Sequence, residues 1–361
     1  MKKFLSALSV LALLAACGDG NPFPSDEMTN EDTDADQDTD GDVTAEDSED
    51  LGIGGDSGLL PGTTSPTSTA SIVRYEAKND ENQGGFVTDV SYNSTDDTFT
   101  VDNLAFDGLN VYSRDSDVDT LSTVNNPTIY AVYEGAETVT DPQTGSSVDQ
   151  FTYRALYGES ANTVVIDGVE LPVSRFAIVR TGSYVNYGFG GFIYERNGGV
   201  VLPTTGQAFY TGEYAGVRVF NNAGGLEYSS GLMDIAVDFN DFDEGDAVRG
   251  VIYDRVYFDI NGNSIPTGTS ATDIPDADVR FEVGPGSITE NGEIGGQLGS
   301  FTLDEDGAVE VYESGTYYGI IGGDNADEVV GVVVLTGDDP RAEGVQFQET
   351  GGFILYREPP T

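Results

Sequence analysis

Cysteine occurs once in this 361-residue chain, at Cys17, and the residues before it predict what happens to its thiol. The chain starts with Met1-Lys2-Lys3, continues with an apolar run over Phe4–Ala16, and reaches the cysteine through Leu14-Ala15-Ala16, the pattern of a lipobox. The run is too short to span a bilayer, and small residues before a cleavage site are typical of bacterial export signals. We therefore predict that residues 1–16 are a signal peptide and that Cys17 takes a diacylglycerol, which anchors the mature chain to a membrane. An ordinary signal peptide with an incidental cysteine is the alternative.

A run of aspartates soon after the cysteine has the spacing of calcium ligands. Asp36, Asp38, Asp40 and Gly41 match positions 1, 3, 5 and 6 of a calcium-binding loop. The twelfth position holds Asp47 where such loops have Glu, and no flanking helix is predicted. The sequence therefore predicts at most weak Ca²⁺ binding by the three aspartates at positions 36, 38 and 40. A plain acidic spacer is the alternative.

The composition excludes several kinds of chemistry. Histidine is absent, which removes Ser-His-Asp catalysis and histidine-bound zinc or haem. Asp and Glu number 63 against 15 Lys and Arg, a net charge of −48 that would repel nucleic acid. Carboxylate-based hydrolysis stays open, but no pair of acids stands out, so we do not expect an enzyme. The acidity is typical of adaptation to salty water, and an acidic face for a cationic partner is the other explanation.

The elements that would position these residues change along the chain. From Gly18 to Asp50 there are 14 acids and no Lys or Arg, and residues 51–70 are rich in Gly, Ser, Thr and Pro. Residues 17–70 are therefore predicted to be a disordered acidic tether. From residue 71 onward, short apolar and aromatic runs alternate with turns, and no window has a helical period. This pattern predicts an all-β chain of antiparallel strands, a sandwich or a barrel, with a boundary between residues 71–203 and 204–361.

Four short segments of the C-terminal part form a recognisable set: Gly206–Gly216, Met233–Phe239, Gly315–Gly319 and Asp324–Val333. They resemble the opening, following and closing strands of the C-terminal β-barrel in the transferrin-binding protein B family. Two positions depart from that pattern, because Tyr317 stands where Phe is usual and Val333 stands near the place of a second aromatic.

The resemblance implies an eight-stranded antiparallel barrel over residues 204–361 and a smaller β-rich, handle-like domain over residues 71–203. The family's receptor has two such lobes, and this chain has room for one, so transferrin specificity is not carried over. The resemblance also implies a lipid-anchored protein on the outer membrane, at the cell surface, that binds a ligand or a host protein, often for iron or haem uptake. The family's binding residues lie in variable loops, so none is assigned here.

Two hypotheses of function follow, besides the hydrolase. The first is a surface binding module that captures a small molecule or a protein, for example an iron or haem source. The second is an adhesive or structural surface lipoprotein that depends on Ca²⁺ held by the aspartates of the tether. In both, the partners are the membrane, through the lipid, and an unidentified ligand, and nucleic acid is excluded.

Overall fold

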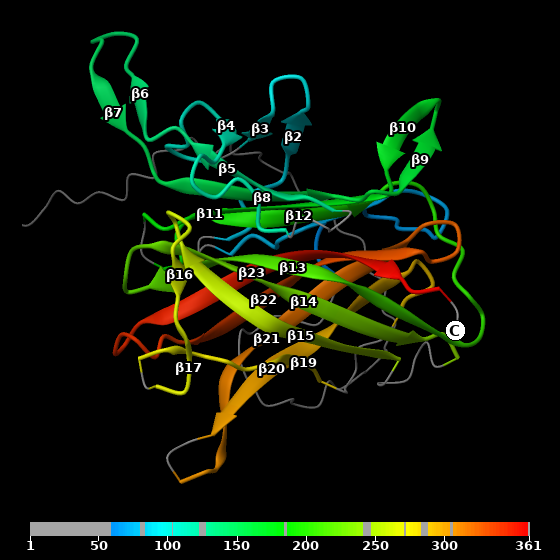
Figure 1. Cartoon of the computed structure of the whole chain (residues 1–361). Helices are drawn as coiled ribbons and strands as arrows, with labels where there is room; N and C mark the ends of the chain where they lie inside the picture. Colours follow the sequence, from blue (N-terminus) through cyan, green and yellow to red (C-terminus); the bar gives the residue numbers. More distant parts are fainter. Residues whose placement is uncertain are drawn as a thin grey trace, which may run out of the picture. The chain divides into compact units, whose positions relative to one another are not determined.

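Figure 1 shows the computed structural model of the chain, which describes residues 59–79, 84–102, 104–122, 128–183, 186–240, 247–270, 272–282, 288–303 and 306–359. These residues form β-strands, turns and loops, and none of them belongs to a helix long and apolar enough to cross a membrane. The predicted all-β class is confirmed. Cys17, the signal peptide and the aspartates at 36, 38 and 40 lie outside the described residues.

The C-terminal part is a closed antiparallel barrel of eight strands, as predicted. Each strand pairs with the next around the ring, and the ring closes where the first strand pairs with the last. In ring order the strands are β13 (Gln207–Asn221), β14 (Leu226–Asp238), β15 (Val248–Asp259), β19 (Val279–Phe281), β20 (Glu293–Leu303), β21 (Val309–Gly322), β22 (Glu328–Asp338) and β23 (Gln346–Arg357). Three short strands lie in the segment between β15 and β19: β16 (Ser264–Ile265), β17 (Thr267–Gly268) and β18 (Ile274–Pro275).

The part before the barrel is a curled sheet of eight antiparallel strands, called here the half-barrel sheet. Its first and last strands do not pair with each other. From edge to edge the strands are β1 (Ile72–Tyr75), β12 (Gly190–Arg196), β11 (Ser174–Thr181), β8 (Tyr153–Glu159), β5 (Tyr130–Gly135), β4 (Val111–Arg114), β3 (Thr98–Val101) and β2 (Val90–Asn93). Two hairpins project from it, β6 (Thr138–Thr140) with β7 (Ser147–Asp149), and β9 (Thr163–Ile166) with β10 (Val169–Pro172) (Figure 1).

Three apolar clusters form the core, and strand alternation assigns them. Along β13, Tyr210 and Tyr214 point into the barrel interior, whereas Val217 and Val219 point outward and pack against the half-barrel sheet. Successive side chains of a strand face opposite sides, so a strand covered on both sides is buried along its length. The third cluster fills the inside of the half-barrel sheet and is rich in aromatic residues, among them Phe99, Tyr112, Tyr133, Tyr153 and Tyr157.

Polar contacts fix the half-barrel sheet on the barrel wall. The hydroxyl of Tyr130 donates to the carbonyl of Glu213 (2.8 Å) and accepts from the backbone N–H of Ile354 (2.9 Å). Arg74 pairs with Glu293 at 2.6 Å, with both side chains buried. The two sheets belong to one compact unit, and these buried contacts join them.

Residues 59–70, which the sequence assigned to the tether, lie against this unit. Thr63 exchanges hydrogen bonds with Val73 of β1, and the fully buried Arg196 donates to the carbonyls of Thr67 and Ala70. The described structure therefore begins before the boundary expected at residue 71. The contacts of this segment are made mainly by its backbone. Its sequence holds few apolar side chains, so the composition did not predict that it would be ordered.

Candidate binding site at the open seam

The two edge strands of the half-barrel sheet, β1 and β2, lie on opposite sides of a cavity of about 260 Å³. This cavity is called here the seam. One wall is strand β2 with the residues before it, from Thr88 to Tyr92. The other wall comes from β1, β11 and β12, through Val73, Arg175, Ile193 and Glu195. The seam exists because the sheet curls without closing. A closed barrel would fill the same space with paired strands.

Aromatic side chains line the inner wall of the seam. The rings of Tyr92 and Tyr157 lie 5.3 Å apart at 36°, and the ring of Phe99 lies 5.5 Å from that of Tyr157. Phe99 and Tyr157 are buried, whereas Tyr92 on the edge strand is half-buried. Such rings present flat apolar faces with a polar hydroxyl at the edge, which suits stacking against another ring or an aliphatic side chain.

Charged groups form the rim of the seam. Arg175 pairs with Glu195 directly across the β11–β12 ladder, with Nε 2.7 Å from Oε1. Burial lowers the pKa of the Arg175 guanidinium, but Glu195 and Tyr157 together outweigh burial and raise it above its usual value. The hydroxyl of Tyr157 donates to Glu159 at 2.8 Å. Burial, and then this carboxylate, raise the pKa of Tyr157, so the phenol stays protonated. With the exposed Asp89 the rim carries more acid than base.

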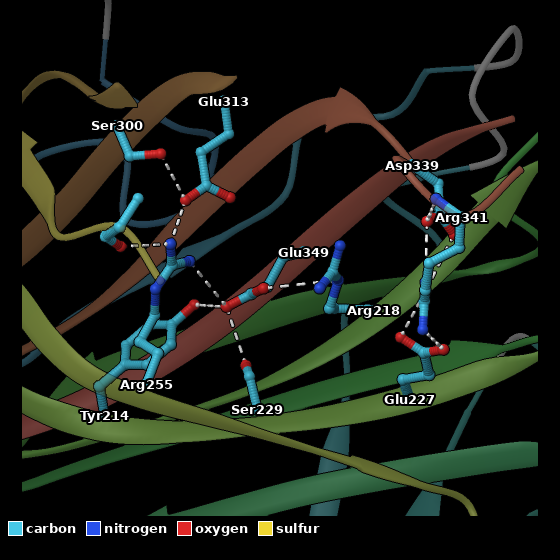
Figure 2. A network of polar contacts seen from close by, with 11 residues as sticks. Tyr214, Arg218, Glu227, Ser229, Arg255, Ser300, Glu313, Asp339, Arg341 and Glu349 are labelled. Carbon is cyan, nitrogen blue, oxygen red and sulfur yellow. Dashed lines mark hydrogen bonds and ion pairs between the residues drawn. The ribbon is translucent and has the colours of Figure 1, made fainter. Parts of the chain in front are cut away.

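Another cluster of charged side chains lies inside the barrel and is enclosed by it. Figure 2 shows Glu349 receiving hydrogen bonds from the hydroxyls of Tyr214 and Ser229, both at 2.8 Å, and lying between two arginines. Arg218 approaches Glu349 at 3.7 Å and Arg255 at 3.9 Å.

The second acid of this cluster is held in the same way. Arg255 also binds Glu313, which accepts a hydrogen bond from Ser300 at 2.9 Å. Glu313, Glu349, Arg218 and Arg255 are all buried, and two cations offset two anions. Carboxylates neutralised and enclosed in this way are poor candidates for acid–base catalysis, which needs access to a substrate.

The candidate site residues from the sequence are not brought together here. Lipidation at Cys17 and Ca²⁺ binding by Asp36, Asp38 and Asp40 stay predictions, because those residues are not described. Among the described residues, no group of three or more Asp, Glu, His or Cys is placed to hold a metal ion.

Sequence reasoning missed the seam. Its residues come from segments near positions 73, 90, 157, 175 and 194, and none of these segments carries a motif. The one available signal was the period-two aromatic pattern, which is also what a core strand shows. The pairing of Arg175 with Glu195 became visible only with the strand register.

No protein-family model matches the chain, and no curated protein matches it in sequence. Several solved structures are similar in fold. A surface lipoprotein matches over 55% of this chain and 80% of its own, with 14% identity and a TM-score of 0.29. A Trp-176-Ala mutant of transferrin-binding protein B from Haemophilus parasuis matches over 75% and 66%, with 9% identity and a TM-score of 0.30. Intact Ap-TbpB, with N and C lobes, matches over 72% and 64%, with 9% identity and a TM-score of 0.25. The chain is thus similar in structure to lobes of these proteins.

Proposed function

We propose that the chain is a lipid-anchored surface binding protein that receives its ligand at the seam of the half-barrel sheet. The observation that carries this proposal is the cavity itself, with aromatic walls and a charged rim, in a sheet that stays open beside a barrel that is closed. Concave, mainly apolar sites with a few placed polar groups are the usual form of ligand sites.

The size of the cavity limits the ligand. At about 260 Å³ it lies just below the range of roughly 300–1,000 Å³ typical of sites for drug-sized molecules. It suits one ring, either a sugar or a single side chain of a larger partner. Haem would require the seam to widen, whereas a protein that carries iron would need to place only one side chain there. A role in iron acquisition is therefore proposed only through binding of a protein that carries iron, not through binding of haem.

Binding is a better account of the seam than catalysis. On the rim, Glu195 of β12 faces the cavity and is paired with Arg175, and Glu159 accepts a hydrogen bond from the hydroxyl of Tyr157. A hydrolytic pair would need one carboxyl held protonated and one ionised at opposite sides of the substrate. Here Glu195 is bound by Arg175 and Glu159 by Tyr157, so neither carboxyl is left unengaged for such a role.

The anchor and the tether complete the proposal. A lipid on Cys17 would hold the chain on the outer membrane, and the roughly forty residues before residue 59, if extended, would reach on the order of 100 Å. The charge of −48 works against adsorption to an anionic membrane surface, so the folded part would stay in solution above it. The anchor is tested with Cys17→Ser, which we expect to abolish labelling by radioactive palmitate and to release the protein from membranes. Labelling that persists would exclude this anchor.

The ligand is sought by thermal shift with glycans, haem, ferric chelates and peptides on the mature chain. A ligand at 100 times its dissociation constant adds about 2.7 kcal/mol of stability, which raises the melting temperature measurably. Tyr92→Ala, which removes a half-buried wall of the seam, should abolish the shift. Tyr75→Ala is the matched control, because Tyr75 is also half-buried in an edge strand but does not line the cavity. A ligand that tolerates Tyr92→Ala and responds to Tyr75→Ala would place the site elsewhere.

A further inference from the structure

The two edges of the half-barrel sheet differ in whether they are already occupied. The outer edge of β1 is covered by the preceding segment, since Thr63 donates its N–H to Val73 (3.0 Å) and Tyr75 donates to Pro61 (3.0 Å). On the other edge, β2 pairs only with β3, and no described residue pairs with its outer side. The open edge is therefore β2, and it is also a wall of the seam.

The hydrogen bonds around β3 tell which backbone groups of β2 face outward. Val101, which lies opposite Val90, donates its N–H to Asn110, away from β2, while Asp102 donates to Asp89 across the ladder (3.1 Å). In an antiparallel pair the residues alternate between hydrogen-bonded and non-bonded positions. Val90 and Tyr92 are therefore at the non-bonded positions, and their N–H and C=O groups point to the open edge.

We propose that the seam takes an extended peptide segment of a partner protein, which adds to β2 as a further antiparallel or parallel strand. This inference rests on the proposed function and names the class of its ligand. An added strand runs about 4.8 Å from β2, and every second side chain of it faces the same side as Val90 and Tyr92. That side is the aromatic cluster inside the half-barrel sheet, so one side chain of the peptide enters the cavity.

The charges of the seam define the peptide further. The side chain that enters the cavity meets Tyr92, Phe99 and Tyr157, which favours an aromatic or branched aliphatic residue. The residues beside it lie near the exposed Asp89 and the Arg175–Glu195 pair, a rim with one more acid than base, in a chain of net charge −48, which favours lysine or arginine. A second copy of this chain is a poor occupant, because it carries the same charge.

Strand addition is tested by amide hydrogen exchange, followed by NMR on the mature chain. The probes are four ten-residue peptides in which Phe, Tyr, Leu or Val alternates with Lys and Thr. We expect at least one to slow exchange about tenfold at the amides of Val90 and Tyr92. The amides of Ser91 and Asn93, which face β3, should change little. The same peptides with Glu in place of Lys should bind much more weakly. Failure of all four peptides, or binding without protection at Val90 and Tyr92, would overturn the inference.

A proline tests the edge without removing the cavity. Val90→Pro takes away an outward N–H, a change that edge strands tolerate because no internal ladder bond is lost. It should weaken peptide binding about tenfold or more, with little change in melting temperature. Val90→Ala is the control, since it shortens the side chain but keeps the N–H, and should retain binding within about threefold. Equal losses in the two variants would assign the effect to packing and contradict strand addition.

The experiments distinguish failure of the seam as the binding site from failure of a peptide strand as its ligand. A sugar that binds the chain and is lost with Tyr92→Ala would keep the seam as the binding site and would exclude a peptide strand as its natural occupant. If every ligand that binds is insensitive to both Tyr92→Ala and Val90→Pro, the seam itself is excluded, and with it both proposals.

Discussion

The barrel and the half-barrel sheet are both antiparallel sheets of eight strands, but only the barrel pairs its first strand with its last. Closure pairs every strand of the barrel on both sides and encloses the interior, so the charges inside it are matched by one another and by buried hydroxyls. The half-barrel sheet keeps one open edge and a cavity beside it. In the function proposed above, the closed sheet is the support and the open sheet carries the binding site.

The ion pairs of the barrel and of the seam differ in how far they are exposed to water. Arg218 and Glu349 in the barrel are 1% and 0% exposed, whereas Arg175 and Glu195 at the seam are 36% and 20% exposed. A buried charge that loses its partner is strongly destabilising, while an exposed pair contributes little because water replaces it. Substitutions in the barrel should therefore change stability, and substitutions at the seam should change binding.

The largest expected effect comes from opening the charge network of the barrel. Glu349→Ala leaves Arg218 and Arg255 without this counter-ion and removes the acceptor of Tyr214 and Ser229. We expect a loss of about 3–5 kcal/mol in the free energy of unfolding, measured by denaturant titration.

The control for this substitution lies on the surface of the same barrel. Asp278 pairs with Arg280, and both side chains are largely exposed, so Asp278→Ala should cost less than about 1 kcal/mol. Similar losses in the two variants would mean that the barrel interior is open to water, and the contrast between the two sheets would disappear.

A smaller, pH-dependent effect is expected where the two sheets meet. Glu328 of β22 is fully buried and accepts hydrogen bonds from Ser160 (2.6 Å), Asn162 (2.7 Å) and Ser174 of the half-barrel sheet. Burial raises its pKa above the usual value, although the three donors oppose that shift. The contribution of the protonated form is thus fully present below the unfolded pKa and is lost as pH rises through the higher folded pKa.

The variant Glu328→Gln isolates this contribution from the other carboxylates. Since glutamine does not ionise, the difference in stability between variant and wild type should shift in favour of the variant as pH rises from about 4 to 7. Denaturant titrations at a series of pH values measure this difference. A difference that is constant with pH, or that moves toward the wild type, would show that Glu328 is not held in a buried, desolvated joint.

The closed sheet was the more predictable of the two. Most of its strands are long, and the segments around Tyr214, Met233 and Val330 lie within them; the resemblance that these segments carry implied the eight-stranded barrel. The open sheet has edge strands of four residues, too short for periodicity to reveal their register. The seam depends on that register and on the curvature of the sheet, which places Tyr92 near Tyr157 although the two are 65 positions apart in the sequence. Arg196 is a further case. The hydrogen bonds of its guanidinium all go to backbone carbonyls, so no acidic residue in the sequence indicates where these contacts are made.

The smallest expected effect on stability is at the seam. In a double-mutant cycle, Arg175→Ala and Glu195→Ala should show a coupling free energy of about 1 kcal/mol or less, because the pair is partly exposed to water. The same cycle measured on ligand binding should show a larger coupling, since a ligand in the seam excludes water from the pair and strengthens it. Isothermal titration with the bound peptide or sugar, at low and high salt, separates the two. Coupling that is equal in the free and bound states would mean that the ligand does not cover the rim, and the seam would then differ from the barrel only in shape.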